Sequence, residues 1–224
     1  LITGASRCIG YDTALLLAAN SDHQVYVLSR NVERLEELSN TAESRYGHAN
    51  LHVIPFDITS LEVAEFIRQI EPIGQVDILI NNAGQLIAKP FAEMPMQEWQ
   101  QLFMVNVFGV VRLIRTLLPY LEKSERAHIV NIGSMGGFQG SSKFPGLAAY
   151  SASKAALANM TECLAEEFKD KNIACNCLAL GAVQTDMLAE AFPGVKAPLT
   201  SAEMAEYLAH FAVEGHRFMN GKII

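Results

Sequence analysis

The chain has 224 residues, of which 50% are hydrophobic, so it can form one domain with a sizeable buried core. Its formal net charge is −7 and no run of Lys or Arg stands out, so neither a nucleic-acid partner nor an anionic membrane partner is expected. We identify no apolar stretch that approaches the length of a bilayer span, and no signal peptide.

The four cysteines show neither the spacing of a metal site nor the pattern of a secreted disulfide framework. They are Cys8, Cys163, Cys175 and Cys177. We therefore expect reduced thiols, no metal and a cytoplasmic protein.

Short apolar runs alternate with amphipathic segments along the whole chain. After the opening residues 1–3, the expected strands are 25–28, 51–56, 76–80, 128–132 and 173–180. These runs are nearly continuous in apolar character, as expected for strands covered on both faces. Because the chain opens and closes in strand-like sequence, we also expect truncation at both ends.

Helices with readable boundaries separate the strands. One follows Asn31, a residue suited to an N-cap, and ends at Gly47. Longer helices are expected over about 97–121 and 148–168. The alternation predicts an α/β fold: a Rossmann-type, doubly wound parallel sheet of about seven strands with helices on both faces, in a single domain over residues 1–224.

The first strand leads into TGASRCIG at residues 3–10, which a helical stretch follows. A strand, a glycine-containing loop and a helix in this order place backbone N–H groups and a helix N-terminus where a pyrophosphate can bind. Considered alone, the loop fits an ordinary tight turn equally well.

The second strand is followed by residues that distinguish NADP from NAD. It ends in Ser29 and Arg30, where an acidic residue would hold a ribose 2′-hydroxyl and favour NAD. Arg30, with Arg7 from the loop, instead suits a 2′-phosphate, because guanidinium groups bind phosphate oxygens bidentately. NADPH is therefore the expected cofactor, and two solvated surface arginines are the alternative.

Small polar residues follow each of the next three strands. Asp57 and Ile58 follow the third, NNAG at 81–84 the fourth, and Asn131 to Ser134 the fifth. In a doubly wound sheet these strand ends share one edge, where ligands bind. Further along, Tyr150 and Lys154 are four residues apart and so share one helix face.

With these features the chain resembles the short-chain dehydrogenase/reductase family, and within it the 3-oxoacyl-(acyl-carrier-protein) reductases. The matching motifs, in order, are TGASRCIG, Asp57, NNAG, Asn106 in VNVFG, Ser134 in NIGSMGG, Tyr150 and Lys154 in YSASK, and GAVQT at 181–185. The resemblance implies an NADPH-dependent reduction of a ketone to a secondary alcohol, with a small-molecule or carrier-bound carbonyl substrate. It also implies a homodimer or homotetramer.

The resemblance assigns four catalytic residues. Tyr150 is the proton donor, Ser134 orients the substrate carbonyl, and Asn106 interrupts its helix and holds a water in a relay to Lys154. Bringing a tyrosine pKa from about 10 to neutrality takes roughly 4 kcal/mol. One cation about 4 Å away supplies about that much at an effective dielectric near 20, and Lys154 is expected to be that cation.

The cofactor-binding residues follow from the same resemblance. They are Gly4, Ser6, Arg7, Ile9 and Gly10 for the pyrophosphate and adenosine, Arg30 for the 2′-phosphate, Asp57 and Ile58 for the adenine, Asn82, Ala83 and Gly84 for the adenosine ribose side, Tyr150 and Lys154 beside the nicotinamide ribose, and Val183 and Thr185 for the carboxamide.

Three positions depart from the family pattern. Cys8 replaces a glycine. The cysteine is tolerated if the loop only has to let its backbone approach the cofactor closely. If the backbone needs a positive φ there, the strain costs about 1–3 kcal/mol. A reactive thiol of low pKa is a further possibility there. Leu180 replaces a proline and is expected to loosen its loop. The stretch between Ser134 and Tyr150 is unusually long, and residues 186–200 are expected to form a short substrate lid.

Two other functions fit less well. An NAD-dependent alcohol dehydrogenase conflicts with Arg7, Arg30 and the missing acid. A non-catalytic cofactor sensor or scaffold would explain Cys8 and Leu180, but it would have no need for all four catalytic residues.

Overall fold

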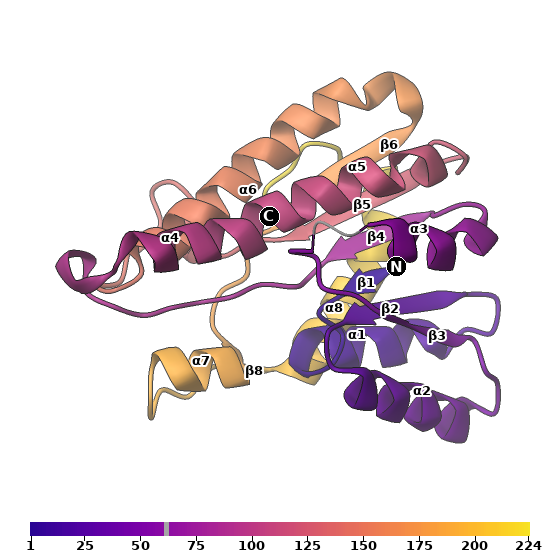
Figure 1. The fold of residues 1–224 in the computed structure, drawn as a ribbon, viewed down its shortest axis with the longest axis horizontal. Coiled ribbons are helices and arrows are strands. Elements are labelled where there is room, and N and C mark those ends of the chain that lie inside the picture. Colours follow the sequence, from indigo (N-terminus) through magenta and orange to yellow (C-terminus); the bar gives the residue numbers. More distant parts are fainter. Residues whose placement is uncertain (61–62) are drawn as a thin grey trace.

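A computed structural model describes residues 1–60 and 63–224. Among these residues, six parallel strands form the central sheet in the order β3-β2-β1-β4-β5-β6 (Figure 1). The strands are β1 (Ile2–Thr3), β2 (Val25–Ser29), β3 (Leu51–Pro55), β4 (Ile78–Asn81), β5 (Ala127–Ile132) and β6 (Ile173–Leu178). The predicted doubly wound Rossmann-type sheet is confirmed.

Helices cover both faces of this sheet. They are α1 (Cys8–Ala18), α2 (Val32–Tyr46), α3 (Ala64–Ile70), α4 (Met96–Phe103), α5 (Gly109–Leu121), α6 (Ala148–Glu167), α7 (Asp186–Ala191) and α8 (Ser201–Glu214). Buried side chains of α1, α2 and α8 form one core with the sheet, and those of α3, α5 and α6 form another. The chain therefore has the three layers that its alternating pattern predicts.

The strand count differs slightly from the expected seven. Residues 221–224 lie beside β6, where Cys177 donates its N–H to the Lys222 carbonyl at 2.8 Å and accepts from the Ile224 N–H at 2.9 Å. This is the bond pattern of a parallel ladder, but it amounts to a single bridge between Cys177 and Ile223. A separate two-stranded sheet joins β7 (Val183–Gln184) to β8 (Leu199–Thr200).

The predicted helix boundaries hold for α2. The Asn31 side chain accepts a hydrogen bond from the Arg34 N–H at 2.8 Å, and Gly47 ends the helix with φ +74°. Both are the local solutions that helix ends favour, because they satisfy backbone groups that the helix itself leaves unpaired.

The helix expected over 97–121 is interrupted once. A π turn (Met104–Phe108) joins α4 to α5, so that residues 96–121 form one continuous helical run. By length and composition alone this run of 26 residues is apolar enough to cross a membrane, which corrects the sequence expectation. Its apolar residues have partners within the fold, because Val110, Leu113 and Leu117 are buried in the core beneath the sheet.

The direction of the winding reverses between β1 and β4. Strand β1 pairs with β2 on one side and with β4 on the other. The loops after β1 and β4 therefore leave the sheet in opposite directions, and they open the crevice in which ligands bind in such folds. The TGASRCIG loop and the NNAG loop are those two segments.

A buried histidine on β5 lies away from this crevice. His128 is fully buried, its Nδ1 bonds to the Ala212 carbonyl at 2.9 Å, and its Nε2 accepts from the Asn176 amide at 3.0 Å. Because one ring nitrogen donates and the other accepts, these partners fit only the neutral ring. The pKa of His128 is lowered to about 4, mainly by burial and to a smaller extent by the nearby His216 and Arg126.

We expect His128 to make the protein less stable in acid. A histidine whose pKa falls from about 6.5 in the unfolded chain to about 4 in the fold binds its proton preferentially when unfolded, so stability is lost as the pH falls through that range. Between pH 7 and pH 5, the chain should lose about 2 kcal/mol more in free energy of unfolding than the variant His128→Gln. Urea denaturation at the two pH values measures this, and equal losses would contradict it.

Candidate functional site

The loops after β1 and β4 are joined directly at the crevice. The Thr3 hydroxyl accepts from the Ala83 N–H at 3.0 Å, and the Asn82 amide donates to the carbonyls of Thr3 and Gly4 at 3.0 and 3.1 Å. Asn82 and Ala83, expected near the adenosine ribose, thus also fix the shape of the glycine-containing loop.

Two glycines make this approach possible. Gly4 has φ +67°, and a Cβ there would lie 2.8 Å from the Cα of Ala83. A Cβ at Gly10 would lie 2.6 Å from the Gly4 carbonyl oxygen. Helix α1 begins within this loop, and the N–H groups of its first turn have no partners inside the helix. The loop therefore fits the pyrophosphate of a dinucleotide.

Cys8 adopts the conformation that favours glycine. Its φ is +51°, so the position requires a positive φ and not merely a small side chain. Burial raises the pKa of the Cys8 thiol above its usual value, although a hydrogen bond from the Asp186 backbone acts in the opposite direction. The thiol is therefore not the reactive, low-pKa group considered from the sequence.

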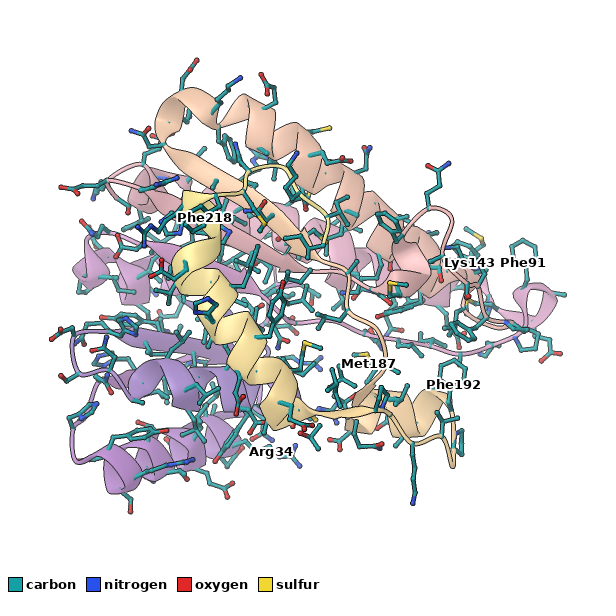
Figure 2. The ribbon with its side chains drawn as sticks, turned by 180° about the vertical axis from the view of Figure 1, so that it is seen from behind. Arg34, Phe91, Lys143, Met187, Phe192 and Phe218 are labelled. Atoms are coloured by element: carbon teal, nitrogen blue, oxygen red, sulfur yellow. The ribbon has the colours of Figure 1, made fainter. Side chains whose placement is uncertain are left out.

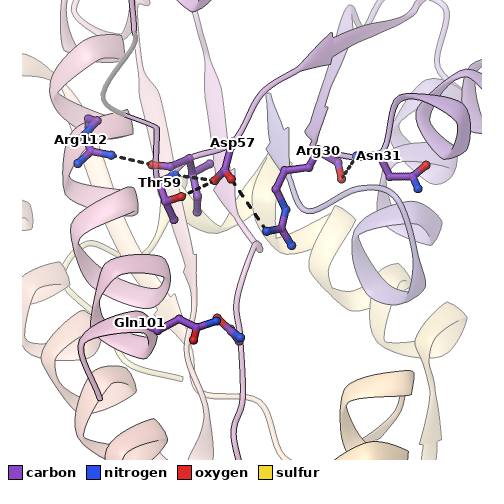
Figure 3. Close-up of polar contacts among 9 residues, drawn as sticks. Arg30, Asn31, Asp57, Thr59, Gln101 and Arg112 are labelled. Atoms are coloured by element: carbon purple, nitrogen blue, oxygen red, sulfur yellow. Dashed lines mark hydrogen bonds and ion pairs between the residues drawn. The ribbon is translucent and has the colours of Figure 1, made fainter. Parts of the chain in front are cut away.

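The two arginines expected at the 2′-phosphate have carboxylate partners in this structure. Arg30 lies 4.0 Å from Asp57, whose other oxygen accepts from the Thr59 N–H at 2.8 Å (Figure 3). The Arg30 side chain is 80% exposed, so this pair leaves it accessible to a phosphate. Arg7 pairs with Asp186 on α7 at 3.0 Å.

The other predicted cofactor residues occupy the same edge. A Cβ on Gly84 would lie 3.3 Å from Lys154 Nζ, which places this loop at the catalytic group. The side chain of Ile58 is buried, so Ile58 offers only its backbone to an adenine. Val183 is buried in β7, and Thr185 caps α7. Ser6 and Ile9 are half-buried in the loop.

Leu180 does not leave its loop loose. Its N–H donates to the Leu178 carbonyl at 3.0 Å, a bond that proline would lack. Its own carbonyl accepts from the Met135 N–H at 2.9 Å. Leu180 therefore holds the segment that carries Ser134.

The Ser134 hydroxyl lies close to that of Tyr150. Ser134 follows β5, and its side chain is near enough to that of Tyr150, at the start of α6, to lower the pKa of the tyrosine. Gly137 makes this approach possible, because a Cβ there would lie 2.7 Å from the backbone of Lys154. The structure thus brings the predicted proton donor and the predicted carbonyl-orienting residue together.

Lys154 is buried beneath this pair. Its side chain donates to the Ile132 carbonyl at 2.7 Å, and the nitrogen lies 6.0 Å from the centre of the Tyr150 ring. Burial lowers the pKa of Lys154 to about 8.

The expected lowering of the Tyr150 pKa does not hold in this structure. Burial raises the pKa of Tyr150, and the neighbouring Ser134 hydroxyl opposes the rise only in part. The ammonium of Lys154 is engaged by the Ile132 carbonyl, and no contribution from it to the Tyr150 pKa offsets the burial of the ring. In this state Tyr150 keeps its proton and can donate it.

Asn106 interrupts its helix, as the resemblance implies. It lies in the π turn and is fully buried. Its side-chain oxygen accepts from the Gln85 N–H, and its amide donates to the Gln85 carbonyl and the Ser153 hydroxyl, each at 2.9 Å. Both amide hydrogens are therefore used within the protein.

Sequence reasoning missed two residues of the site. Ser153 donates to the Tyr150 carbonyl at 2.7 Å and accepts from Asn106, so it connects two of the predicted catalytic residues. Its position three residues after Tyr150 in a helix is the signal that could have indicated this bond. Asp186, the partner of Arg7, is 179 residues away in the chain, and no local pattern indicates that contact.

Comparisons with known proteins agree with this geometry. A family model described as short chain dehydrogenase matches residues 1–196. A fatty acyl-CoA reductase of Acinetobacter baylyi is 34% identical over 217 residues, covering 95% of this chain and 72% of that protein. A 3-oxoacyl-(acyl-carrier-protein) reductase FabG of Thermotoga maritima is 32% identical over 84% of this chain and 74% of its own length.

Solved structures also match over nearly the whole chain. A short chain dehydrogenase of Shigella flexneri, complexed with NADP, has a TM-score of 0.88 at 29% identity and is matched over 99% of this chain and 94% of its own. A short chain dehydrogenase of Escherichia coli, complexed with NADPH, has a TM-score of 0.88 at 28% identity, with 100% and 94% covered.

We expect the variant Cys8→Gly to be more stable than the natural chain. Glycine removes the cost of a left-handed backbone at this position, about 1 kcal/mol in free energy of unfolding. Cys8→Ala is the matched control, because alanine keeps the unfavourable φ and should show no gain. Urea denaturation compares the three proteins. A Cys8→Gly protein no more stable than Cys8→Ala would show that Cys8 is not strained.

Proposed function

The chain belongs to the short-chain dehydrogenase family, and on that premise we propose that it is an enzyme that reduces a ketone to a secondary alcohol with NADPH. The observation that carries the proposal is the hydroxyl pair of Ser134 and Tyr150 above the buried amine of Lys154. A proton donor, a carbonyl-orienting hydroxyl and a cation thereby lie together at the strand edge where the fold binds ligands.

The chain's own residues supply the proton side of the reaction. NADPH supplies the hydride when it is bound. The Tyr150 hydroxyl, kept protonated by its buried surroundings, gives its proton to the carbonyl oxygen as negative charge develops there. Ser134 donates a hydrogen bond to the same oxygen, and Lys154 stabilises the tyrosinate that remains.

The segment after β2 favours NADPH over NADH. Arg30 is exposed there and Ser29 takes the place of an acid at the end of β2, so a 2′-phosphate can meet the guanidinium, which the Asp57 carboxylate contacts at only 4.0 Å. Relatives of known structure complexed with NADP and NADPH support this choice. An NAD-dependent alcohol dehydrogenase would need the opposite charge pattern.

The substrate proposed first is a 3-oxoacyl thioester, free or on a carrier, since the similar proteins include a 3-oxoacyl-(acyl-carrier-protein) reductase and a fatty acyl-CoA reductase. Residues 186–200 form its lid in this proposal. We also propose a homodimer or homotetramer, which would cover the exposed Met104 and Phe108 on the outer face of the 96–121 helix.

One observation favours a non-catalytic alternative. The positive φ of Cys8 strains the loop that would hold the pyrophosphate, as in a protein that has lost turnover. The arrangement of Ser134, Tyr150 and Lys154 favours the enzyme, and a turnover measurement decides between the two.

Tyr150→Phe should abolish reduction while leaving NADPH binding nearly unchanged. The substitution removes the donated proton but not the ring, and general-acid catalysis contributes about 10²- to 10⁴-fold to such a step. NADPH oxidation in the presence of a ketone measures turnover, and nucleotide fluorescence measures binding. Tyr207→Phe, on the exposed surface of α8, is the control. Full activity in Tyr150→Phe would remove Tyr150 from the mechanism.

Arg30→Ala should weaken NADPH binding by about tenfold or more and leave NADH binding unchanged. A hydrogen bond to a charged group contributes about 1.5–3 kcal/mol, and only NADPH carries the 2′-phosphate that Arg30 would contact. Arg45→Ala, at the other end of α2, serves as the control. Equal losses for both nucleotides would show that Arg30 does not read the 2′-phosphate.

A further inference from the structure

We infer that Phe144 and Phe192 together form an aromatic surface that binds an extended apolar chain of the substrate. The inference rests on the proposed reductase function and specifies its substrate class: a ketone or 3-oxoacyl compound with a chain of several methylene groups. Two segments that flank the candidate active site carry these residues.

The first segment is the unusually long stretch after Ser134. It begins one turn beyond that hydroxyl and ends at the start of α6, which carries Tyr150. A substrate whose carbonyl meets Ser134 and Tyr150 would therefore extend past this stretch. Phe144 lies within it and is 53% exposed.

This stretch is held in one shape by its own polar groups. Lys143 donates to the carbonyls of Gly136 and Phe138, and the Ser141 hydroxyl donates to the Phe138 carbonyl at 2.8 Å. At its far end, the Gly146 carbonyl accepts from the Lys89 N–H at 3.0 Å. The charge of Lys143 is thus engaged in holding the loop, and Phe144 beside it is presented on a fixed backbone.

The second segment follows Thr185, at the opposite side of the site. It contains α7, and Phe192 directly follows that helix. The rings of Phe144 and Phe192 meet edge to face, with centroids 5.9 Å apart and planes at 64°. In Figure 2, Phe192 and Met187 project from the α7 segment, and Lys143 marks the loop that the ring pair connects to it.

Further apolar side chains beside this ring pair are exposed to solvent. Met135 next to Ser134, Phe138 in the first segment, and Val195 and Leu199 in the second are also exposed, so both sides of the site carry exposed apolar side chains. Exposed apolar side chains that flank a polar site are typical of a ligand-binding groove. An unbranched hydrocarbon chain is the occupant that fits, because the pair offers rings and no free polar group to a ligand.

The test is a series of 2-alkanones from 2-butanone to 2-decanone, reduced by the intact chain with NADPH. We expect kcat/KM to rise with each added methylene, by about fourfold at most, which corresponds to complete burial of that group. Phe144→Ala and Phe192→Ala should each flatten the rise for long ketones and leave 2-butanone unchanged. Because each ring helps to position the other, the double variant should lose little more than either single one.

Phe91→Ala is the matched control, since Phe91 is 72% exposed and contacts Trp99 edge to face rather than either segment. Phe91 and Phe144 are exposed and Phe192 is half-buried, so none of the three lies in the core, and thermal unfolding should show that each variant remains folded. Reduction that does not depend on chain length, or an equal effect of Phe91→Ala, would overturn the inference while leaving the reductase function intact. No reduction of any ketone by a chain that binds NADPH would instead overturn the proposed function.

Discussion

The buried amide of Asn106 is the interaction on which the candidate site depends. It joins three elements that are distant in the sequence: the helix in which it lies, the loop after β4 through Gln85, and α6 through Ser153. Each of its polar atoms would carry a desolvation cost of about 1–3 kcal/mol if left unpaired, so the three elements are held in one arrangement. The π turn at Asn106 is the local distortion that directs the amide toward these partners.

The Asn106 amide also fixes which face of α6 is turned toward the site. Ser153, bound by Asn106, bonds to the Tyr150 carbonyl, and Lys154 is the next residue along the helix. Tyr150 and Lys154 are therefore placed toward the sheet edge together, where Ser134 meets the first and the Ile132 carbonyl meets the second. Burial keeps the tyrosine protonated, as a proton donor requires, and it lowers the pKa of the lysine to about 8, so the ammonium is still the major form at pH 7.

Much of this arrangement could be predicted from the sequence because it depends on local rules. Continuous apolar runs indicate strands covered on both faces, Asn31 and Gly47 delimit a helix, and polar residues after parallel strands must gather at one edge. The loops that bring Ser134, Tyr150 and Lys154 together are of this kind. The family resemblance added the helix break at Asn106, which no periodicity would indicate.

The remaining features depend on three-dimensional packing that residue type does not encode. A cysteine at position 8 is compatible with either sign of φ, and only the geometry of the folded loop shows that φ is +51°. The Tyr150 pKa depends on how deeply the ring is buried and on where the Lys154 amine is directed. The contacts of Phe144 with Phe192 and of Arg7 with Asp186 join segments far apart in the chain.

The most direct test of the reductase assignment is a product measurement on the natural chain. The purified protein is incubated with NADPH and a panel of 2-alkanones and 3-oxoacyl thioesters, and the secondary alcohol formed is quantified against the NADPH consumed. The account predicts one alcohol for each NADPH oxidised. Tight NADPH binding without alcohol from any member of the panel would contradict it, and would favour a cofactor-binding protein without turnover.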